Sequence, residues 1–501
     1  MQIRARGLET ELDFALLEKK SNKSVAFLKL CDEAITPIIK KCFSDILAVF
    51  FRRGLALSLE ESRKFLKDGS LFYQDRSNFE IATPECASTD DLLKRSNTTE
   101  ANLISAFWEI PRDESLAANV FIELIKKGSD FSAGMGGIAS HENYHFNKPD
   151  NEGCKDDLEE HLIPFLLGRS PFVGDGHLKD NGQFIPSSRL AMVTFKVSQS
   201  SGQRGGKPMI ILRRDEQDTG DVDYNNFCRV QVCSSSSNMS SFCTKFRLGT
   251  TSIIFRLIEE GPSLLPRIAL ADPVAAANQA GEDFNLRFKY ALKNGEEISL
   301  LGINKEYFKA AKGFFESNSA SEEEFEMMNF WEEALKNIEH YPSVLDKLTD
   351  DRILYKFLTF VLESKYQLSW DDLISALHSD DKENLSKAEK ILTKLQWLNL
   401  KYFFLTDDSL RQFLKTHGFM DESLLSPRDF INDPDCFQPP ADTRAAWRVA
   451  AMQFMQKRFL LSQSGFGWGK FDLASIRFSR FNRDPLNSKF DAEEVDSKLK
   501  Y

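Results

Sequence analysis

The sequence contains no long hydrophobic run and no excess of positive charge. No stretch approaches the roughly 20 consecutive apolar residues that a membrane-spanning helix needs, so we expect no membrane partner. The 64 Lys and Arg residues are outnumbered by 75 Asp and Glu residues, which gives a net charge of −11. An acidic chain is poorly suited to binding the phosphates of nucleic acid, so we expect no nucleic-acid partner either. Residues 1–15 carry charges throughout and have no apolar signal core, which predicts a cytoplasmic protein.

Several common sites of chemistry are also missing. Of the eight cysteines, Cys228, Cys233 and Cys243 lie near one another but lack the paired C-x-x-C spacing of a zinc site, which favours reduced thiols. The glycine-rich run Gly134–Ala139 superficially matches a dinucleotide fingerprint, but no helix follows it directly. No G-x-S-x-G elbow of a serine hydrolase is present. These absences exclude the usual dinucleotide, structural-zinc and serine-hydrolase classes.

The composition is typical of a soluble globular protein, with 42% hydrophobic and 28% charged residues. Strand patterns come early and most helical patterns come late, which predicts an α+β fold. The strands are expected at Gln2–Ala15, Leu71–Gln74, Ala191–Val197, Met209–Leu212 and Val230–Cys233. Helices are expected over residues 23–52, Phe246–Glu260, most of residues 305–418 and Thr443–Phe459, and short strands around Phe471–Phe481.

Two polar segments look like connections between these elements. Pro149–Asp157 is acidic and predicts a surface loop. The run Ser234–Ser237 is either a flexible low-complexity linker or part of the structure that follows the strand at Val230–Cys233.

Acidic residues and one histidine form the most informative pattern. Alternation along the first strand puts Glu9 and Glu11 on one face. Further carboxylates follow at Asp75 and Glu80, and His141 lies in a third segment. Clustered carboxylates repel one another unless a cation neutralises them. Carboxylates on strands together with a histidine therefore predict a site for a hard cation such as Mg²⁺, held against nucleotide phosphates.

The ordered set of motifs resembles the Pup ligase and Pup deamidase (depupylase) family of proteasome accessory enzymes. The matching segments run through nearly the whole chain: Gly7–Glu11, Asp75 with Glu80, Thr83–Cys86, Ser140–Tyr144, Arg214–Glu216, Asn238-Met239, Leu248–Thr251, Leu257–Pro262, Asp272–Val274 and Pro439–Ala445. The resemblance implies a glutamine-synthetase-like fold, in which an antiparallel sheet is flanked by helices. It also implies a catalytic domain over residues 1–425 and a small C-terminal domain over residues 426–501.

The resemblance assigns roles to individual residues. Asp75 would be the catalytic residue beside the terminal phosphate of ATP. Mg²⁺ would be held by Glu9, Glu11, Glu80 and His141, with Gln231 at a further metal position where the family has a histidine. The candidates for nucleotide and phosphate binding are Arg189, Arg214, Asn238, Arg444 and Arg448, because the planar arginine fork suits bidentate phosphate contacts.

Three functions follow from the resemblance, each with a Pup-like modifier as partner. The favoured one is an ATP-dependent deamidase or isopeptidase acting on the C-terminal Gln or Glu side chain of that modifier. The step from Asp75 to Glu80 is similar to the deamidase spacing, and Leu248–Thr251 with Glu259–Pro262, and Gln367–Trp370, also resemble deamidases more closely. Against it, residues 12–70 show no copy of the deamidase insertion loop. The alternatives are a ligase that joins a modifier glutamate to a substrate lysine, and a catalytically weakened modifier-binding homologue. Departures from the family at Gln231 and Gly128–Asp130 support the last of these.

Overall fold

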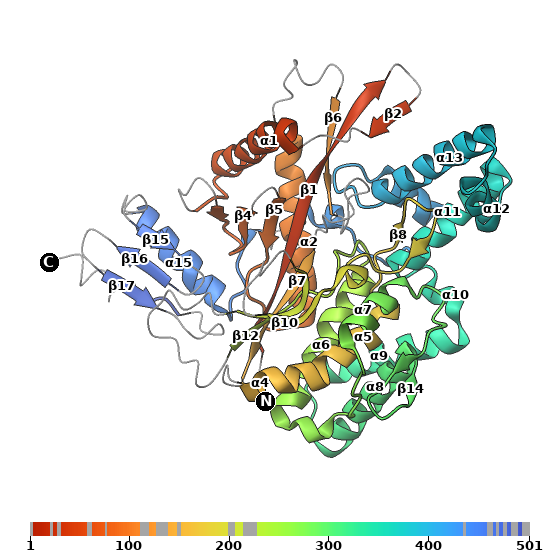
Figure 1. Ribbon diagram of the computed structural model, residues 1–501. Helices are drawn as coiled ribbons and strands as arrows, with labels where there is room; N and C mark the ends of the chain where they lie inside the picture. Colours follow the sequence, from red (N-terminus) through yellow and green to blue (C-terminus); the bar gives the residue numbers. More distant parts are fainter. Residues whose placement is uncertain are drawn as a thin grey trace.

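The body of the molecule is one large sheet with helices packed against it (Figure 1). The computed structural model describes residues 4–20, 24–27, 32–57, 63–75, 78–110, 120–126, 139–147, 152–198, 206–213, 228–433, 437–457, 464–466, 470–473, 478–481 and 489–492. Within these residues, no helix combines the length and the apolar composition required to span a bilayer.

The large sheet has ten strands and is almost entirely antiparallel. Eight of them run in the order β10-β11-β12-β7-β1-β5-β4-β3, and β2 and β6 pair with β1 off this path. Among the described strands of this sheet, only β10 and β11 pair in parallel. The strands are β1 (Arg6–Lys20), β2 (Ser24–Phe27), β3 (Arg63–Phe65), β4 (Leu71–Asp75), β5 (Asn78–Ala82), β6 (Val120–Ile125), β7 (Ser140–Phe146), β10 (Phe195–Ser198), β11 (Pro208–Arg213) and β12 (Cys228–Val232).

Helices dominate the later part of the chain, as the sequence predicts. The α-helices are α1 (Asp32–Arg52), α2 (Thr89–Trp108), α4 (Glu152–Asp157), α5 (Ile163–Gly168), α6 (Ser241–Glu260), α7 (Pro273–Glu282), α8 (Leu300–Ser317), α9 (Glu322–His340), α10 (Pro342–Leu345), α11 (Asp350–Tyr366), α12 (Trp370–Leu377), α13 (Lys382–Lys401), α14 (Ser409–Thr416) and α15 (Arg444–Lys457). A π-helical turn, η1 (Leu158–Leu162), joins α4 to α5, and short 3₁₀ turns lie at Ser170–Phe172, Leu190–Met192, Pro262–Leu264 and Pro427–Phe430.

Three small strand groups complete the description. They are β8 (His177–Leu178) with β9 (Phe184–Ile185), β13 (Tyr290–Ala291) with β14 (Glu297–Ile298), and the C-terminal meander β15 (Ser464–Phe466), β16 (Lys470–Leu473) and β17 (Phe478–Phe481). The meander lies beside α15 at the left of Figure 1.

One face of the large sheet carries the apolar core. In β1, Leu8 and Leu12 are buried on this face, and alternation sends Glu9 and Glu11 to the other. In β7, the rings of Tyr144 and Phe146 lie 4.8 and 5.2 Å from Phe255 of α6. The core continues under α5, α8 and α9 at one end, and under α1, α2, α11 and α13 at the other. We call the opposite, polar face of the sheet the site face.

Helix α6 shows how local sequence sets an element that supports this core. The Ser240 side chain caps it by accepting a hydrogen bond from the Cys243 backbone N–H, and Gly261-Pro262 follows its last residue. The expected helix at Phe246–Glu260 is confirmed, but it starts at Ser241, because the capping serine rather than the apolar pattern fixes the start.

Two expected connections prove to be ordered structure. The linker interpretation of Ser234–Ser237 is wrong: all four residues are buried, and Ser235 and Ser236 contact Arg169 and Arg247 through hydrogen bonds. Residues 152–157 of the expected loop Pro149–Asp157 form α4, in which Cys154 is buried against the core while its neighbours Gly153 and Lys155 face solvent. A polar composition hid the ordered serine run, since polar groups of serine can be satisfied by buried arginines.

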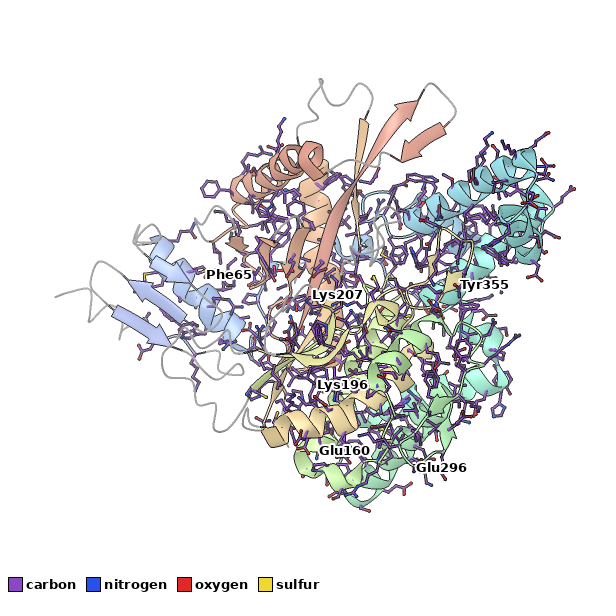
Figure 2. All side chains as sticks on the ribbon, viewed as in Figure 1. Phe65, Glu160, Lys196, Lys207, Glu296 and Tyr355 are labelled. Atoms are coloured by element: carbon purple, nitrogen blue, oxygen red, sulfur yellow. The ribbon has the colours of Figure 1, made fainter. Side chains whose placement is uncertain are left out.

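The C-terminal helix α15 packs on the site face at the β3–β4 edge. Trp447 and Met452 join Phe65, Leu71 and Ala82 in a small apolar cluster. The guanidinium of Arg448 lies 4.8 Å from the centre of the Phe65 ring, which Figure 2 places between the sheet and α15. The boundary at residue 425 between two domains remains a prediction, and this cluster shows that α15 shares apolar packing with the sheet.

A carboxylate clamp fixes α15 to the sheet. Glu85, just beyond β5, accepts hydrogen bonds from Arg448 at 2.8 and 3.2 Å and from Arg444 at 2.9 Å. Burial favours the protonated acid, but the two arginines outweigh it and lower the pKa of Glu85 to about 2. Arg448 also donates to the Gly69 carbonyl at 3.0 Å, so it connects two loops of the sheet to the helix.

We expect this clamp to stabilise the fold only where Glu85 is ionised. The folded pKa lies below the usual value of 4.5, so the contribution is complete above about pH 4.5 and is lost as the pH falls toward about 2. The shift corresponds to roughly 3 kcal/mol at neutral pH. Glu85→Gln should lower the free energy of unfolding at pH 7 by an amount of that order, and the difference from wild type should shrink near pH 3 in denaturant titrations.

Glu109 provides the matched control, because it pairs with Arg53 on the surface. Surface pairs contribute about 0–1 kcal/mol. An equal loss of stability in Glu85→Gln and Glu109→Gln would contradict the clamp.

Candidate active site

The register of β1 gathers the predicted acids and the histidine on the site face. Glu9 pairs with His141 of β7, and Glu11 pairs with Glu80 of β5. Because directly opposed residues in antiparallel strands point to the same side, these four side chains share one face. The predicted site is therefore assembled by three neighbouring strands, although its residues span more than 130 positions of sequence.

His141 lies between the two glutamates of β1. Its Nδ1 is 3.6 Å from Glu9 Oε2, and its Nε2 is 3.8 Å from Glu11 Oε1. Glu11 also accepts a hydrogen bond from the backbone N–H of Ala139 at 2.6 Å. Glu9 and His141 are each only 8% exposed. The imidazole thus touches both acids from one position, in a largely desolvated setting.

Gln231 of β12 reaches the same carboxylate. Its Nε2 donates to Glu9 Oε2 at 2.6 Å. Arg229, two residues earlier on the same strand, places Nη1 3.7 Å from Glu9 Oε1 and 3.4 Å from Asn143 Oδ1. The structure therefore brings Gln231 into the site, as the sequence predicts, and it adds Arg229 and Asn143. Alternation along β12 and β7 is the signal that could have identified these two, since each is two residues from a predicted site position.

Tyr73 is a further residue of the site. Its hydroxyl donates to Glu80, with which it pairs across β4 and β5. Burial, followed by the negative charges of Glu9 and Glu80, raises the pKa of Tyr73 well above its usual range. Tyr73 therefore stays protonated and serves as a permanent hydrogen-bond donor that orients Glu80.

Asp75, the predicted catalytic residue, is the last residue of β4 and pairs with Asn78. It lies two residues from Tyr73 along the strand, which is a register position beside the acids. Its side chain and the whole of Arg214 lie outside the described residues. The roles of both residues remain predictions.

The other phosphate-binding candidates occupy different places. Arg444 lines the pocket on the site face and also donates to Glu85, whereas Arg448 is fully buried against the same carboxylate. Arg189 donates from Nε to the carbonyl of Cys233, just past β12, at 2.8 Å. Asn238 donates to Asp350 and to the Val173 carbonyl at 3.0 and 3.2 Å.

A solvent-open pocket lies next to the acids on the site face. Its lining includes Gly7, Glu9, Asn143, Arg229 and Arg444. A Cβ at Gly7 would meet only Thr83 Oγ1 within 4 Å, at 3.8 Å, so the glycine leaves the pocket floor bare. The bare backbone floor and the two arginines suit an anionic ligand such as a nucleotide, and a cation would offset the charge of the adjoining Glu9 carboxylate.

The types of ligand present suit magnesium, but these side chains alone do not complete a coordination shell. Carboxylate oxygens are the ligands that Mg²⁺ prefers, and three are combined here with one imidazole. Across the part of the chain that the structure describes, however, no group of three His, Cys, Asp or Glu side chains is close enough to hold an ion by itself. A magnesium site would therefore need ligands in addition to these residues, and nucleotide phosphates are the usual source.

A buried ionic network on the core side of β7 supports the site residues His141 and Asn143. Glu142, between His141 and Asn143, pairs with Arg169 at 2.6 Å, and both side chains are fully buried. Arg169 also donates to Thr251 of α6, and Arg247 of α6 donates to Ser140 Oγ at 2.6 Å. Alternation in the His-Glu-Asn-Tyr motif thus sends two residues to the site and two into the core.

Comparison with known proteins identifies the family. The profile of the family described as "Pup-ligase protein" matches residues 4–471. The chain belongs to the Pup-ligase family. Pup–protein ligase of Kineococcus radiotolerans is 31% identical over 327 residues, which cover 64% of this chain and 69% of that protein. The Pup–protein ligase of Acidimicrobium ferrooxidans is 28% identical over 415 residues, 81% and 82% of the two chains.

Solved structures show the same fold. The complex between the prokaryotic ubiquitin-like protein Pup and its ligase PafA matches with a TM-score of 0.75 and 21% identity, over 99% of this chain and 92% of that one. The Pup ligase PafA in complex with ADP matches with a TM-score of 0.69 and 20% identity, over 96% and 97% of the chains. The predicted glutamine-synthetase-like fold and the predicted enzyme family are confirmed. The preference for the deamidase branch gains no support, because these relatives bear the name of the ligase.

We expect Gln231→His to retain nucleotide binding and to tighten it if a metal ion lies beside Glu9. An amide oxygen and an imidazole nitrogen can both ligate a divalent ion but differ in reach and donor strength, so the change should not abolish binding. Isothermal titration with magnesium and ATP measures the effect, and Gln412→His on the exposed face of α14 is the control. Loss of binding in a folded Gln231→His protein would show that this strand position does not face the nucleotide.

Proposed function

We propose that this chain is an ATP- and magnesium-dependent carboxylate–amine ligase. It would join the side-chain carboxylate of a C-terminal glutamate on a Pup-like modifier to a lysine of another protein. The observation that carries the proposal is the contact of His141 with both Glu9 and Glu11 beside an anion-suited pocket, in a chain of the Pup-ligase family.

The relatives support ligation over deamidation. Two of the most similar relatives are Pup–protein ligases, and two of the solved structures that match are of the Pup ligase PafA, one with Pup and one with ADP. The step from Asp75 to Glu80, one basis of the deamidase interpretation, spans the connection between β4 and β5, whose ends pair at Asp75 and Asn78. A connection between strands tolerates changes in length better than the paired strands do, so its length is a weak marker of the reaction.

The three glutamates and the histidine of the site face would bind the metal ion that accompanies ATP. Bound Mg²⁺ would offset the charge of the phosphates and of the carboxylates. Glu9, Glu11, Glu80 and His141 would hold it, with Tyr73 fixing the orientation of Glu80. Burial of Glu9 and Glu80 strengthens their electrostatic interaction with a cation, because the local dielectric is low.

The remaining residues would handle the nucleotide and the proton. Arg229 and Arg444 line the pocket from two sides and would contact phosphate oxygens. ATP would activate the modifier carboxylate by transferring its terminal phosphoryl group. Asp75, at the end of β4, would then accept a proton from the incoming lysine amine, so that the nitrogen can attack the activated carbonyl.

Metal dependence is the first test of this assignment. Removing one ligand should weaken magnesium-dependent ATP binding at least tenfold in Glu9→Ala or Glu11→Ala, equivalent to about 1.4 kcal/mol. Titration calorimetry with and without magnesium measures this, and Glu297→Ala, on an exposed position of β14, should stay within about 0.5 kcal/mol of wild type. Equal ATP affinity with and without magnesium would remove the metal from the proposal.

Reaction direction is the second test, and Asp75 is its probe. Asp75→Asn should abolish turnover but keep magnesium-ATP binding, because an amide neither accepts the proton nor acts as a nucleophile. The wild-type protein should form a conjugate and release ADP and phosphate when given a glutamate-ended modifier and a lysine donor. Gln74→Glu, at the neighbouring position of β4, is the control for a change of charge on this strand.

Two other results would redirect the proposal. Ammonia release from a glutamine-ended modifier, without conjugate formation, would restore the deamidase. Absence of both reactions in a protein that binds ATP and the modifier would favour the weakened homologue, in which Gln231 has replaced a ligand.

A further inference from the structure

Two buried thiols lie side by side at the edge of the core. Cys154 of α4 and Cys228 of β12 are 2% and 3% exposed, and their Sγ atoms are 3.7 Å apart. They are 74 residues apart in sequence and belong to the same apolar cluster. A disulfide has an S–S length of about 2.05 Å, so the sulfur atoms need to approach by roughly 1.7 Å. Rotation about the Cα–Cβ bonds and a small shift of α4 would have to supply this movement.

The pair is not part of a metal site within the described residues. A structural metal site needs three or four ligands, and no third His, Cys, Asp or Glu joins these two within ligand distance there. Cys233, on the same segment, turns its Sγ toward the Gln231 carbonyl oxygen at 3.7 Å. Oxidation to a disulfide is the chemistry that two adjacent thiols share.

The position of both residues gives an oxidant a route to them. Cys154 is the inward-facing residue of the six-residue surface helix α4, between exposed Gly153 and Lys155. Cys228 is the first residue of β12. Ends of helices and strands open locally at a much lower free-energy cost than global unfolding. Fraying of one turn of α4 would expose Cys154 without disturbing the centre of the sheet (Figure 1).

We propose that Cys154 and Cys228 form a reversible disulfide when the protein meets a peroxide. One thiolate attacks the peroxide O–O bond, which gives a sulfenic acid and releases hydroxide, protonated to water. The other thiolate attacks the sulfenic sulfur, which forms the S–S bond and releases the second water. Two thiols are oxidised by two electrons in total, and one hydrogen peroxide is reduced to two waters.

The cross-link would tie α4 to the strand that contributes to the site. Cys228 faces the core, and the next residue, Arg229, faces Glu9. The disulfide would therefore fix the start of β12 on its core side while leaving the site side chains in place. This inference rests on the two thiols alone and does not depend on the reaction proposed above.

Cys86 is the matched control. It is fully buried, its Sγ lies 3.4 Å from the Pro84 carbonyl oxygen, and burial raises the pKa of its thiol well above the usual range. Cys86 follows β5 on the opposite side of β1 from β7 and β12. It should therefore stay reduced under conditions that oxidise the pair.

The experiment treats the reduced full-length protein with hydrogen peroxide, denatures it, and alkylates the remaining thiols. Two of the eight cysteines should escape alkylation, the intact mass should fall by about 2 Da before alkylation, and dithiothreitol should reverse both changes. Peptide mapping without reduction should recover one cross-linked peptide pair that contains Cys154 and Cys228.

Variants confirm the assignment. Cys154→Ala and Cys228→Ala should each abolish the loss of 2 Da, and Cys86→Ala should keep it, with circular dichroism confirming the fold of each. The proposal is overturned if all eight thiols of the wild type remain alkylatable, if mapping finds a different cysteine pair, or if the two thiols gain about 32 Da each as sulfinic acids instead of cross-linking. The wild-type map decides the question even if a variant fails to fold.

Discussion

The pairing register of β1 between β5 and β7 is the constraint on which the rest of the molecule depends. It sets Glu9 opposite His141 and Glu11 opposite Glu80, and the same register buries Leu8 and Leu12 on the core face. A slip of one residue would exchange the two faces, putting leucines in the site and glutamates in the core. Burying those carboxylates in an apolar core would cost free energy, and this cost protects the geometry of the site. The alternation of side chains along β1 therefore specifies both the hydrophobic packing and the site.

Polar contacts next to the site residues make this register rigid. Glu142 lies between His141 and Asn143, and its buried pair with Arg169 ties β7 to α6 and to the serine run after β12. Breaking such a pair from one side leaves a buried charge without compensation, which typically costs several kcal/mol. On the site face, Glu85 does the same for α15, which brings Arg444 to the edge of the pocket. The clamp and the network thus hold the site from its two sides.

Much of this site could be predicted from the sequence, for a physical reason. Glu9 and Glu11, and likewise His141 and Asn143, are related by strand alternation, which needs no knowledge of tertiary structure. The order of the motifs then suggested that separate segments meet, and the pairing of β1 with β5 and β7 confirms it. Arg448 shows where this reasoning stops. An arginine beside an expected phosphate site is instead held by Glu85, because nearest partners depend on how a distant helix packs.

The sequence alone determined the α+β class, the run of late helices, the acids of the site face and the family resemblance, since all of these depend on local periodicity and on residue type. Only the tertiary structure decided the contacts of these residues across the fold. It showed Ser234–Ser237 buried against Arg169 and Arg247, α4 in place of a loop, Tyr73 on Glu80, and Cys154 beside Cys228. Contacts between distant residues follow from the free energy of packing the whole chain. A polar or sulfur-bearing side chain could be satisfied by many residues of the sequence, and only the folded structure decides which of them lies close enough to contact it.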